Sequence, residues 1–156
     1  MTVPSKKSLV AASLSLAVLL AGAFGPTDAQ SRQMVSVDRP EINMRTGPGT
    51  GHDSVWLLSR GYPLQVLERK GKWLQVKDFE NDKGWVYRPL TDRTPHFVVK
   101  AKVANIRKGP STRTRIVGKA EYGDVLRTLA HKGDWAKIRD ADGLVGWVAQ
   151  RLLWGW

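Results

Sequence analysis

The stretch K-G-K-W-L-Q-V-K-D-F-E-N-D-K-G-W-V, residues 70–86, decides the fold, because it returns as K-G-D-W-A-K-I-R-D-A-D-G-L-V-G-W-V at residues 132–148. Both stretches share a Lys-Gly pair, a Trp shortly after it and Gly-Trp-Val at the end, each 62 residues apart. Working outward, the match runs without insertion from Val37 and Val99 to Leu90 and Leu152. A repeat of this length predicts two copies of one module.

Each module is predicted to consist of short strands separated by turns. Leu64 and Val66 alternate with Gln65, and apolar alternation resumes at residues 73–77, beyond the Lys-Gly pair. Alternation of this kind predicts strands with one buried face, and glycine at a turn can take the positive φ that tight hairpins require. Asp142-Gly143 is a further turn signal. With five or six strands in roughly 60 residues, each module is predicted to form a small barrel, because closure removes exposed sheet edges.

The first 29 residues have a different composition from the rest of the chain. Lys6 and Lys7 precede an apolar run that ends near Phe24, and small residues follow. This order is typical of a secretory signal peptide, with cleavage favoured after Ala29 and Ala23 as the second choice. The alternative is a membrane anchor, which is disfavoured because the run is rich in Ala and Ser and shorter than the roughly 20 apolar residues that a span needs.

The predicted organisation therefore has five parts. They are a signal peptide (1–29), a short N-terminal lead (30–34), a first barrel (35–90), a linker (91–95) and a second barrel with an apolar C-terminal tail (96–156). Leu152 is expected to close the second barrel as Leu90 closes the first. Trp154 and Trp156 follow it, and they are expected either to pack between the repeats or to form an exposed apolar patch.

Charge and cysteine content limit the possible partners. The chain has a formal net charge of +11 and no Cys, which excludes disulfides, thiol catalysis, Cys-based zinc sites and lipid attachment at a processed N-terminal Cys. Residues 35–90 carry a net +2, whereas residues 97–156 carry +7. Positive charge favours acidic partners. Because the chain is expected to be exported, nucleic acid is not an expected partner, whereas anionic lipid headgroups, cell-wall carboxylates or an acidic protein face are.

Strand phase places the tryptophans on the outside of each barrel. Val76 and Val86 are expected in the first core, and neighbouring residues of a strand point to opposite faces. Trp73 and Trp85 should therefore lie on the outer face, beside Tyr87. Trp135 and Trp147 are expected to do the same in the second repeat. Such a cross-strand pair can seal the barrel wall or form a ligand platform, and the sequence leaves both interpretations open.

The ordered set N-x-R-x-G-P-x-T, G-x-x-L, K-G-x-W and G-W-V resembles the bacterial SH3-like (SH3b) domain. It occurs at 43–50, 61–64, 70–73 and 84–86, and again from Asn105 to Val148. The resemblance implies an all-β fold of two small, partly open SH3-like barrels in tandem. The chain is also similar to modules that attach cell-wall hydrolases to peptidoglycan, and to stand-alone envelope proteins. No catalytic domain is visible in this sequence, and the acidic loop of proline-rich peptide binders is missing from both repeats.

The first motif of each repeat carries an arginine. Arg45 and Arg107 can bind a ligand carboxylate in a bidentate fork, or can fix their loop to the barrel, and the second interpretation is preferred. Gly47 and Gly109 are expected to provide unusual φ angles in these loops, and Asn43 and Asn105 to hold a turn. In residues 105–119 there are five basic residues and no acid. They are Arg107, Lys108, Arg113, Arg115 and Lys119. This basic loop is either simply solvated or makes the second repeat the half that binds an anionic ligand.

No active site is predicted. His52, His96 and His131 are not at metal-ligand spacings, and no Ser or Thr has a recognisable base partner. Asp78, Glu80 and Asp82 lie in an expected hairpin turn, where acids are ordinary. We therefore expect no enzyme activity, no cofactor and no metal.

The expected function is that of an exported, non-catalytic binding module of the bacterial envelope, periplasmic or attached to the envelope. Its expected partner is a cell-wall peptide or an envelope protein. The candidate ligand-binding residues are Trp73, Trp85, Tyr87, Trp135, Trp147, Arg45, Arg107, Lys108, Arg113 and Arg115. The alternatives are a structural protein that uses its Trp faces for protein contacts, distinguished by its oligomeric state, and a basic binder of anionic surfaces.

Overall fold

The structure is a computed structural model that describes residues 32–156. The predicted signal peptide and its cleavage site lie outside the described residues. None of the helical segments within residues 32–156 has the length and apolar character needed to cross a bilayer.

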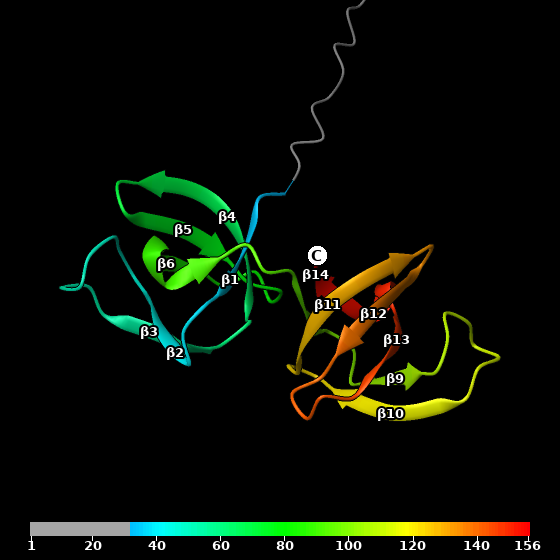
Figure 1. The fold of residues 1–156 in the computed structure, drawn as a ribbon. Helices are drawn as coiled ribbons and strands as arrows, with labels where there is room; N and C mark the ends of the chain where they lie inside the picture. The colour runs from blue at the N-terminus through cyan, green and yellow to red at the C-terminus, as the bar shows by residue number, and fades with distance from the viewer. Residues whose placement is uncertain (1–31) are drawn as a thin grey trace, which may run out of the picture. The chain divides into compact units, whose positions relative to one another are not determined.

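The two repeats have the same series of elements (Figure 1). The first repeat contains β1 (Met34–Val37), β2 (Glu41–Arg45), β3 (Ser54–Ser59), β4 (Pro63–Lys70), β5 (Trp73–Lys77), β6 (Lys83–Tyr87), the 3-10 helix η1 (Arg88–Leu90) and β7 (Thr91–Asp92). The second repeat contains β8 (His96–Val99), β9 (Val103–Arg107), β10 (Ile116–Glu121), β11 (Val125–Lys132), β12 (Trp135–Arg139), β13 (Val145–Ala149), the 3-10 helix η2 (Gln150–Leu152) and β14 (Leu153–Gly155).

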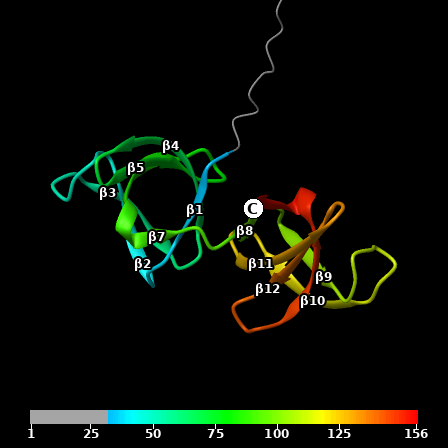
Figure 2. The same ribbon diagram turned by 45° about the horizontal axis from the view of Figure 1, so that its top comes forward.

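Each repeat is one curled antiparallel sheet. Its strand order is β3-β2-β6-β5-β4-β1-β7 in the first repeat and β10-β9-β13-β12-β11-β8-β14 in the second. Figure 2 shows the strands of the first repeat curving around its interior. The predicted all-β class with two SH3-like barrels in tandem is confirmed. Each sheet has seven strands rather than five or six, because a short strand follows each 3-10 helix.

The central hairpin of each repeat forms as its sequence predicts. β4 pairs with β5 and β11 with β12, and Gly71 and Gly133 at the turns have φ of 58° and 54°. A bulge interrupts both hairpins, after Val66 in the first and after Thr128 in the second. The next turn has Gly143 with φ 89° in the second repeat, and Asn81 with φ 69° at the matching place in the first. Asn is among the few residues other than Gly that tolerate this region.

Two separate apolar cores follow from strand alternation. Leu64, Leu74, Val76 and Val86 are fully buried in the first core, and Leu126, Ala136, Ile138 and Val148 hold the matching places in the second. Leu90 and Leu152 pack against their cores from the 3-10 helices, as predicted. Burying this surface is the main favourable contribution to folding, since neither repeat has a disulfide.

The segment between the barrels and the C-terminal tail are equivalent strands. Thr91 and Asp92, which the sequence assigned to the linker, form β7 against β1. Leu153 and Trp154 form β14 against β8 at the matching place. The tail is thus a strand of the second sheet, with Leu153 in the core. The Thr128 hydroxyl donates to the Trp156 carbonyl oxygen at 2.6 Å, so the C-terminus also satisfies this buried polar group.

Candidate functional site

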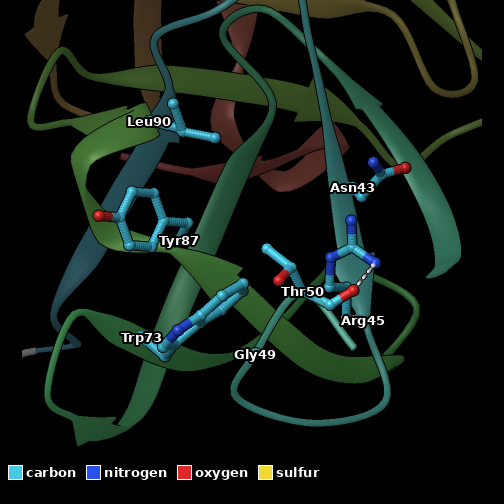
Figure 3. Close-up of a pocket in the computed structure, with 7 residues that line it drawn as sticks. All are labelled: Asn43, Arg45, Gly49, Thr50, Trp73, Tyr87 and Leu90. Carbon is cyan, nitrogen blue, oxygen red and sulfur yellow. Dashed lines mark hydrogen bonds between the residues drawn. The ribbon is translucent and has the colours of Figure 1, made fainter. Parts of the chain in front are cut away.

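The first repeat carries a cleft of about 450 Å³ on the outer side of its barrel. Figure 3 shows its seven lining residues. They come from β2, the β2–β3 loop, β5, β6 and η1, and are Asn43, Arg45, Gly49, Thr50, Trp73, Tyr87 and Leu90. The rings of Trp73 and Tyr87 lie on one side of the cleft, with Asn43 and Arg45 on the other and Thr50 between them (Figure 3).

Pairing of β5 with β6 builds the aromatic side of this cleft. Trp73 and Tyr87 are directly opposite each other in the antiparallel ladder, and their ring centroids are 5.3 Å apart at an angle of 56°. A tilted aromatic pair at this distance is a favourable arrangement. The cleft therefore offers a rigid aromatic wall opposite a guanidinium and an amide group.

The second repeat carries a cleft of about 500 Å³ at the equivalent position. Asn105, Arg107, Thr112, Trp135 and Leu152 line it, each 62 residues after its counterpart in the first cleft. The other lining residues are Val103, Asp134, Ala149, Gln150 and Arg151. Ala149 stands where Tyr87 stands in the first repeat, so Trp135 has no aromatic partner across the ladder.

Strand phase places all four of these tryptophans outside the cores, and one in each repeat lines the cleft described above. Trp73 and Trp135 are lining residues. Trp85 lies on the outer face between Gln75 and Arg45, and only 9% of its surface is exposed. Trp147 occupies the matching place, between Lys137 and Arg107. Trp85 therefore matches the wall-sealing interpretation better than the ligand platform, whereas Trp147 is only half-buried.

Arg45 and Arg107 both reach the loop that follows their strand. Arg45 Nη1 donates to the carbonyl oxygens of His52 at 2.8 Å and Thr50 at 3.4 Å. Arg107 Nη1 donates to the Thr114 carbonyl oxygen at 2.7 Å. The preferred interpretation, that these arginines hold their loops, matches this geometry. Because a guanidinium has five N–H donors, each arginine keeps further donors for a ligand.

The small residues of the loops have a steric role that differs from the expected one. Neither Gly47 nor Gly109 has a positive φ. A Cβ on Gly47 would lie 2.6 Å from the His52 ring, and one on Gly109 would lie 3.0 Å from Thr114 Cγ2. The expectation of unusual φ was therefore wrong, and the requirement is space. Asn43 likewise lies within β2 instead of a turn, and its Oδ1 accepts from the Ser54 hydroxyl at 2.9 Å.

Of the five basic residues of the second loop, Arg107 lines the cleft, whereas Lys108, Arg113, Arg115 and Lys119 do not. Lys108, Arg113 and Arg115 are exposed in the connection between β9 and β10, which extends from the second repeat in Figure 1. Thr112 from the same connection does line the cleft. The lysine and the two arginines therefore add positive charge to the loop beside the cleft, but they are not lining residues.

The acidic turn between β5 and β6 is organised by its first carboxylate. Asp78 Oδ1 accepts from the backbone N–H groups of Glu80 and Asp82, both at 2.9 Å. In the second repeat, Asp140 accepts from Asp142 and Leu144 in the same way. One carboxylate oxygen from each of Asp78, Glu80 and Asp82 lies within 4.8 Å of the others. Turn stabilisation accounts for this grouping, and it lies apart from the cleft residues.

Burial raises the pKa of the Asp78 carboxyl above its ordinary value. The two backbone N–H donors oppose this effect, while the neighbouring Asp82 and Glu80 carboxylates add to it. A carboxylate that accepts two hydrogen bonds in a buried turn is typical of a structural residue.

Several cleft residues were not identified from the sequence. Four of them are repeated at the 62-residue spacing, but the sequence did not indicate that they line a cleft. They are Thr50, Thr112, Leu90 and Leu152. Asp134 and Arg151 differ from their counterparts Lys72 and Pro89, and no motif marks them. They line the second cleft because the β11–β12 turn and η2 meet beside Trp135.

Comparison with protein families gives two matches of the same kind. The family described as "Bacterial SH3 domain" matches residues 38–92 and 100–155. The chain belongs to the bacterial SH3 domain family. Each match covers one of the two sheets except its first strand, β1 or β8, and each includes the cleft of its repeat.

Curated relatives are larger proteins that are named as amidases. The chain is 26% identical over 141 residues to "Putative N-acetylmuramoyl-L-alanine amidase YrvJ" of Bacillus subtilis, covering 79% of the chain and 27% of that protein. It is 30% identical over 61 residues to "Probable cell wall amidase LytH" of Staphylococcus epidermidis, covering 38% of the chain and 20% of that protein. The chain thus spans about a fifth to a quarter of the length of these relatives.

Among solved structures, an NlpC/P60 family protein from Bacillus cereus is similar, with a TM-score of 0.38 and 13% identity. The similar part covers 80% of this chain and 56% of that one.

Proposed function

We propose that this protein is an exported, non-catalytic binding module of the bacterial cell envelope that recognises peptidoglycan peptides through its two clefts. The observation that carries this proposal is the repetition of the cleft. The first cleft is lined by Trp73 and Arg45. The second is lined by Trp135 and Arg107, which hold the matching places on the second barrel. Aromatic and arginine side chains are the residue types most often found at binding hot spots.

The chemistry of the linings supports binding over catalysis. The first cleft presents aromatic rings, an amide, a hydroxyl and a guanidinium, and the guanidinium already donates to loop carbonyls. A guanidinium with free donors is suited to a carboxylate, and an aromatic wall to an apolar or flat group. Cell-wall peptides carry both kinds of group.

The relatives support the same cellular setting. Both curated relatives are named as amidases, one of them as a probable cell wall amidase, and the chain matches only a part of each. A module shared by such proteins is suited to holding a protein on peptidoglycan. We extend this role to the present chain as a binder in the periplasm or on the envelope.

The test of the proposal is sedimentation of residues 31–156 with insoluble peptidoglycan in about 10 mM and about 1 M salt, where the Debye length is about 30 Å and 3 Å. Retention at both salts is the expected result. Retention only at low salt would reduce the interaction to charge attraction by the basic surface. Absence of retention at both salts would overturn the proposal.

A second candidate function is contact with an envelope protein through β3. This strand is at the edge of the first sheet, and Val55, Trp56 and Leu57 are 43%, 51% and 60% exposed. Three consecutive exposed apolar side chains on an edge strand are unusual for a soluble surface. Co-purification of an envelope protein that is lost in Trp56→Lys would favour this candidate, and unchanged co-purification would reject it.

A further inference from the structure

The exact repeat spacing allows the two clefts to be compared residue by residue. They share the Trp, the Arg, the Asn, the Thr and the Leu. At the other lining positions the two repeats differ: Tyr87 is replaced by Ala149, Lys72 by Asp134, Pro89 by Arg151, Arg88 by Gln150, Glu41 by Val103 and Gly49 by Ser111. Two of these replacements, Asp134 and Arg151, place charged residues in the lining of the second cleft.

The first cleft has one charged lining residue, Arg45, and a largely apolar surround. Tyr87 doubles the aromatic wall beside Trp73. On the opposite side, the strongly exposed Leu57 pairs with Asn43 across β2 and β3. This cleft offers one positive group to a carboxylate and no negative group to an ammonium.

The second cleft has lining charges of both signs. Arg107 and Arg151 are positive and Asp134 is negative. Lys119 pairs with Asn105, at the place that Leu57 holds in the first repeat. Among residues 32–156, the one ion pair closer than 4.0 Å joins Arg39 and Asp38, so the cleft charges do not neutralise one another by direct pairing. They remain available to a ligand.

We propose that the second cleft selects a short peptide that carries both a free ammonium and a free carboxylate group, whereas the first cleft, with Arg45 as its one charged lining residue, binds the carboxylate alone. Asp134 accepts from the ammonium group, and the guanidinium groups of Arg107 and Arg151 donate to the carboxylate. This proposal rests on the proposed function and names the ligand class of one of its two sites.

The indole N–H signals of Trp135 and Trp73 report the two clefts separately in an NMR titration of residues 31–156. The probes are trialanine with free ends and N-acetyl-trialanine amide, which has no charge. We expect free trialanine to shift the Trp135 signal with an affinity about three- to tenfold above that of the capped peptide, in the range of one or two exposed charge pairs. The Trp73 signal should show a preference below about threefold, because Arg45 is the one charged lining residue of the first cleft.

Matched variants locate the preference. The double variant Asp134→Lys with Arg151→Gln gives these two positions the charges that Lys72 and Pro89 have in the first repeat. Both side chains are exposed, so folding should be unaffected. This variant is expected to lose the preference for the free peptide at Trp135. The reciprocal variant, Lys72→Asp with Pro89→Arg and Tyr87→Ala, is expected to gain it at Trp73.

Three results would overturn the proposal: equal affinity of the two peptides at Trp135, a preference that survives Asp134→Lys with Arg151→Gln, or no response of Trp135 to either peptide. If insoluble peptidoglycan is still retained in any of these cases, only the ligand class is rejected. If retention is absent as well, the proposed function itself fails.

Discussion

At the residue scale, the arginines of the repeated motif connect stability with binding. Each of Arg45 and Arg107 begins in the strand beside its cleft and donates to carbonyl oxygens of the loop that carries Thr50 or Thr112. The loop residues of each cleft are therefore held in place before any ligand arrives. Such preorganisation reduces the entropy cost of binding.

Asp78 gives a prediction about pH and stability. Its pKa is raised in the folded protein, so its contribution to stability is present below the ordinary Asp pKa of about 3.9 and is lost as the pH rises through the folded-state value. Asn at this position keeps the Oδ1 acceptor for Glu80 and Asp82 without the charge. We expect Asp78→Asn to be at least as stable as the wild type at pH 7, with the difference shrinking as the pH falls below about 4.

Asp78→Ala is the matched comparison, because it leaves both backbone donors without their acceptor. A loss of about 1–3 kcal/mol in the free energy of unfolding is expected. Urea denaturation at several pH values measures both variants. If Asp78→Asn were as destabilising as Asp78→Ala at pH 7, the turn would depend on the charge and this account of Asp78 would be wrong.

The face of the strand on which a side chain lies could be predicted at this scale. The extent to which neighbouring side chains cover it could not. Alternation correctly placed Trp73 and Trp85 outside the first core. It could not show that Trp85 would be covered between Gln75 and Arg45 while Trp73 remained beside a cleft, since this depends on which strands neighbour β6. The glycines of the loops show the same limit. Gly47 is required by the His52 ring, a neighbour brought in by the fold of the loop.

At the element scale, the glycine of Gly-Trp-Val sets the approach of two strands. A Cβ on Gly146 would overlap Ile106 Cγ2 and would lie 2.8 Å from the Arg107 carbonyl oxygen. On Gly84 it would meet Met44 Cγ at 2.5 Å and the Arg45 carbonyl oxygen at 3.0 Å. The close approach of β6 to β2, and of β13 to β9, therefore requires glycine.

We expect Gly146→Ala and Gly84→Ala to lower the free energy of unfolding by about 1–3 kcal/mol, as overpacking does. Gly146→Ala should be the more damaging, because branched Ile106 and a backbone oxygen can move less than the flexible Met44 side chain. Gly51→Ala is the control, since no atom lies within 4 Å of its Cβ and its φ is not positive. Thermal unfolding monitored by circular dichroism compares the three. Equal melting temperatures for Gly51→Ala and Gly146→Ala would contradict the close-approach argument.

Hairpins could be predicted from the sequence, whereas the closing strands could not. The alternation around Lys-Gly shows β4 and β5 directly. β7 consists of Thr91 and Asp92 alone, which carry no strand pattern, and it forms because η1 brings the chain back beside β1. Once β7 is known, the C-terminal tail becomes its counterpart. Neither of the roles expected for Trp154 and Trp156 included this strand.

At the scale of the whole molecule, the repeat provides two sites of one design with different charge. The net charge is +2 over residues 35–90 and +7 over residues 97–156. The second cleft lies beside the exposed Lys108, Arg113 and Arg115, which attract anions over longer distances but are screened by salt. The clefts themselves could not be predicted in full, because each joins residues that are more than 40 positions apart in the chain.

The measurement that most directly tests the central claim is the affinity of residues 31–156 for insoluble peptidoglycan in tryptophan variants. Trp73→Ala and Trp135→Ala remove the aromatic wall of one cleft each, and Trp56→Ala removes an exposed tryptophan that lines neither cleft. We expect each cleft variant to bind roughly tenfold or more weakly, as for a hot-spot residue, and the double variant to lose retention with its folding intact by circular dichroism. Trp56→Ala should bind as the wild type does. Unchanged retention of the double variant, or loss of retention in Trp56→Ala alone, would contradict the claim that the clefts are the binding sites.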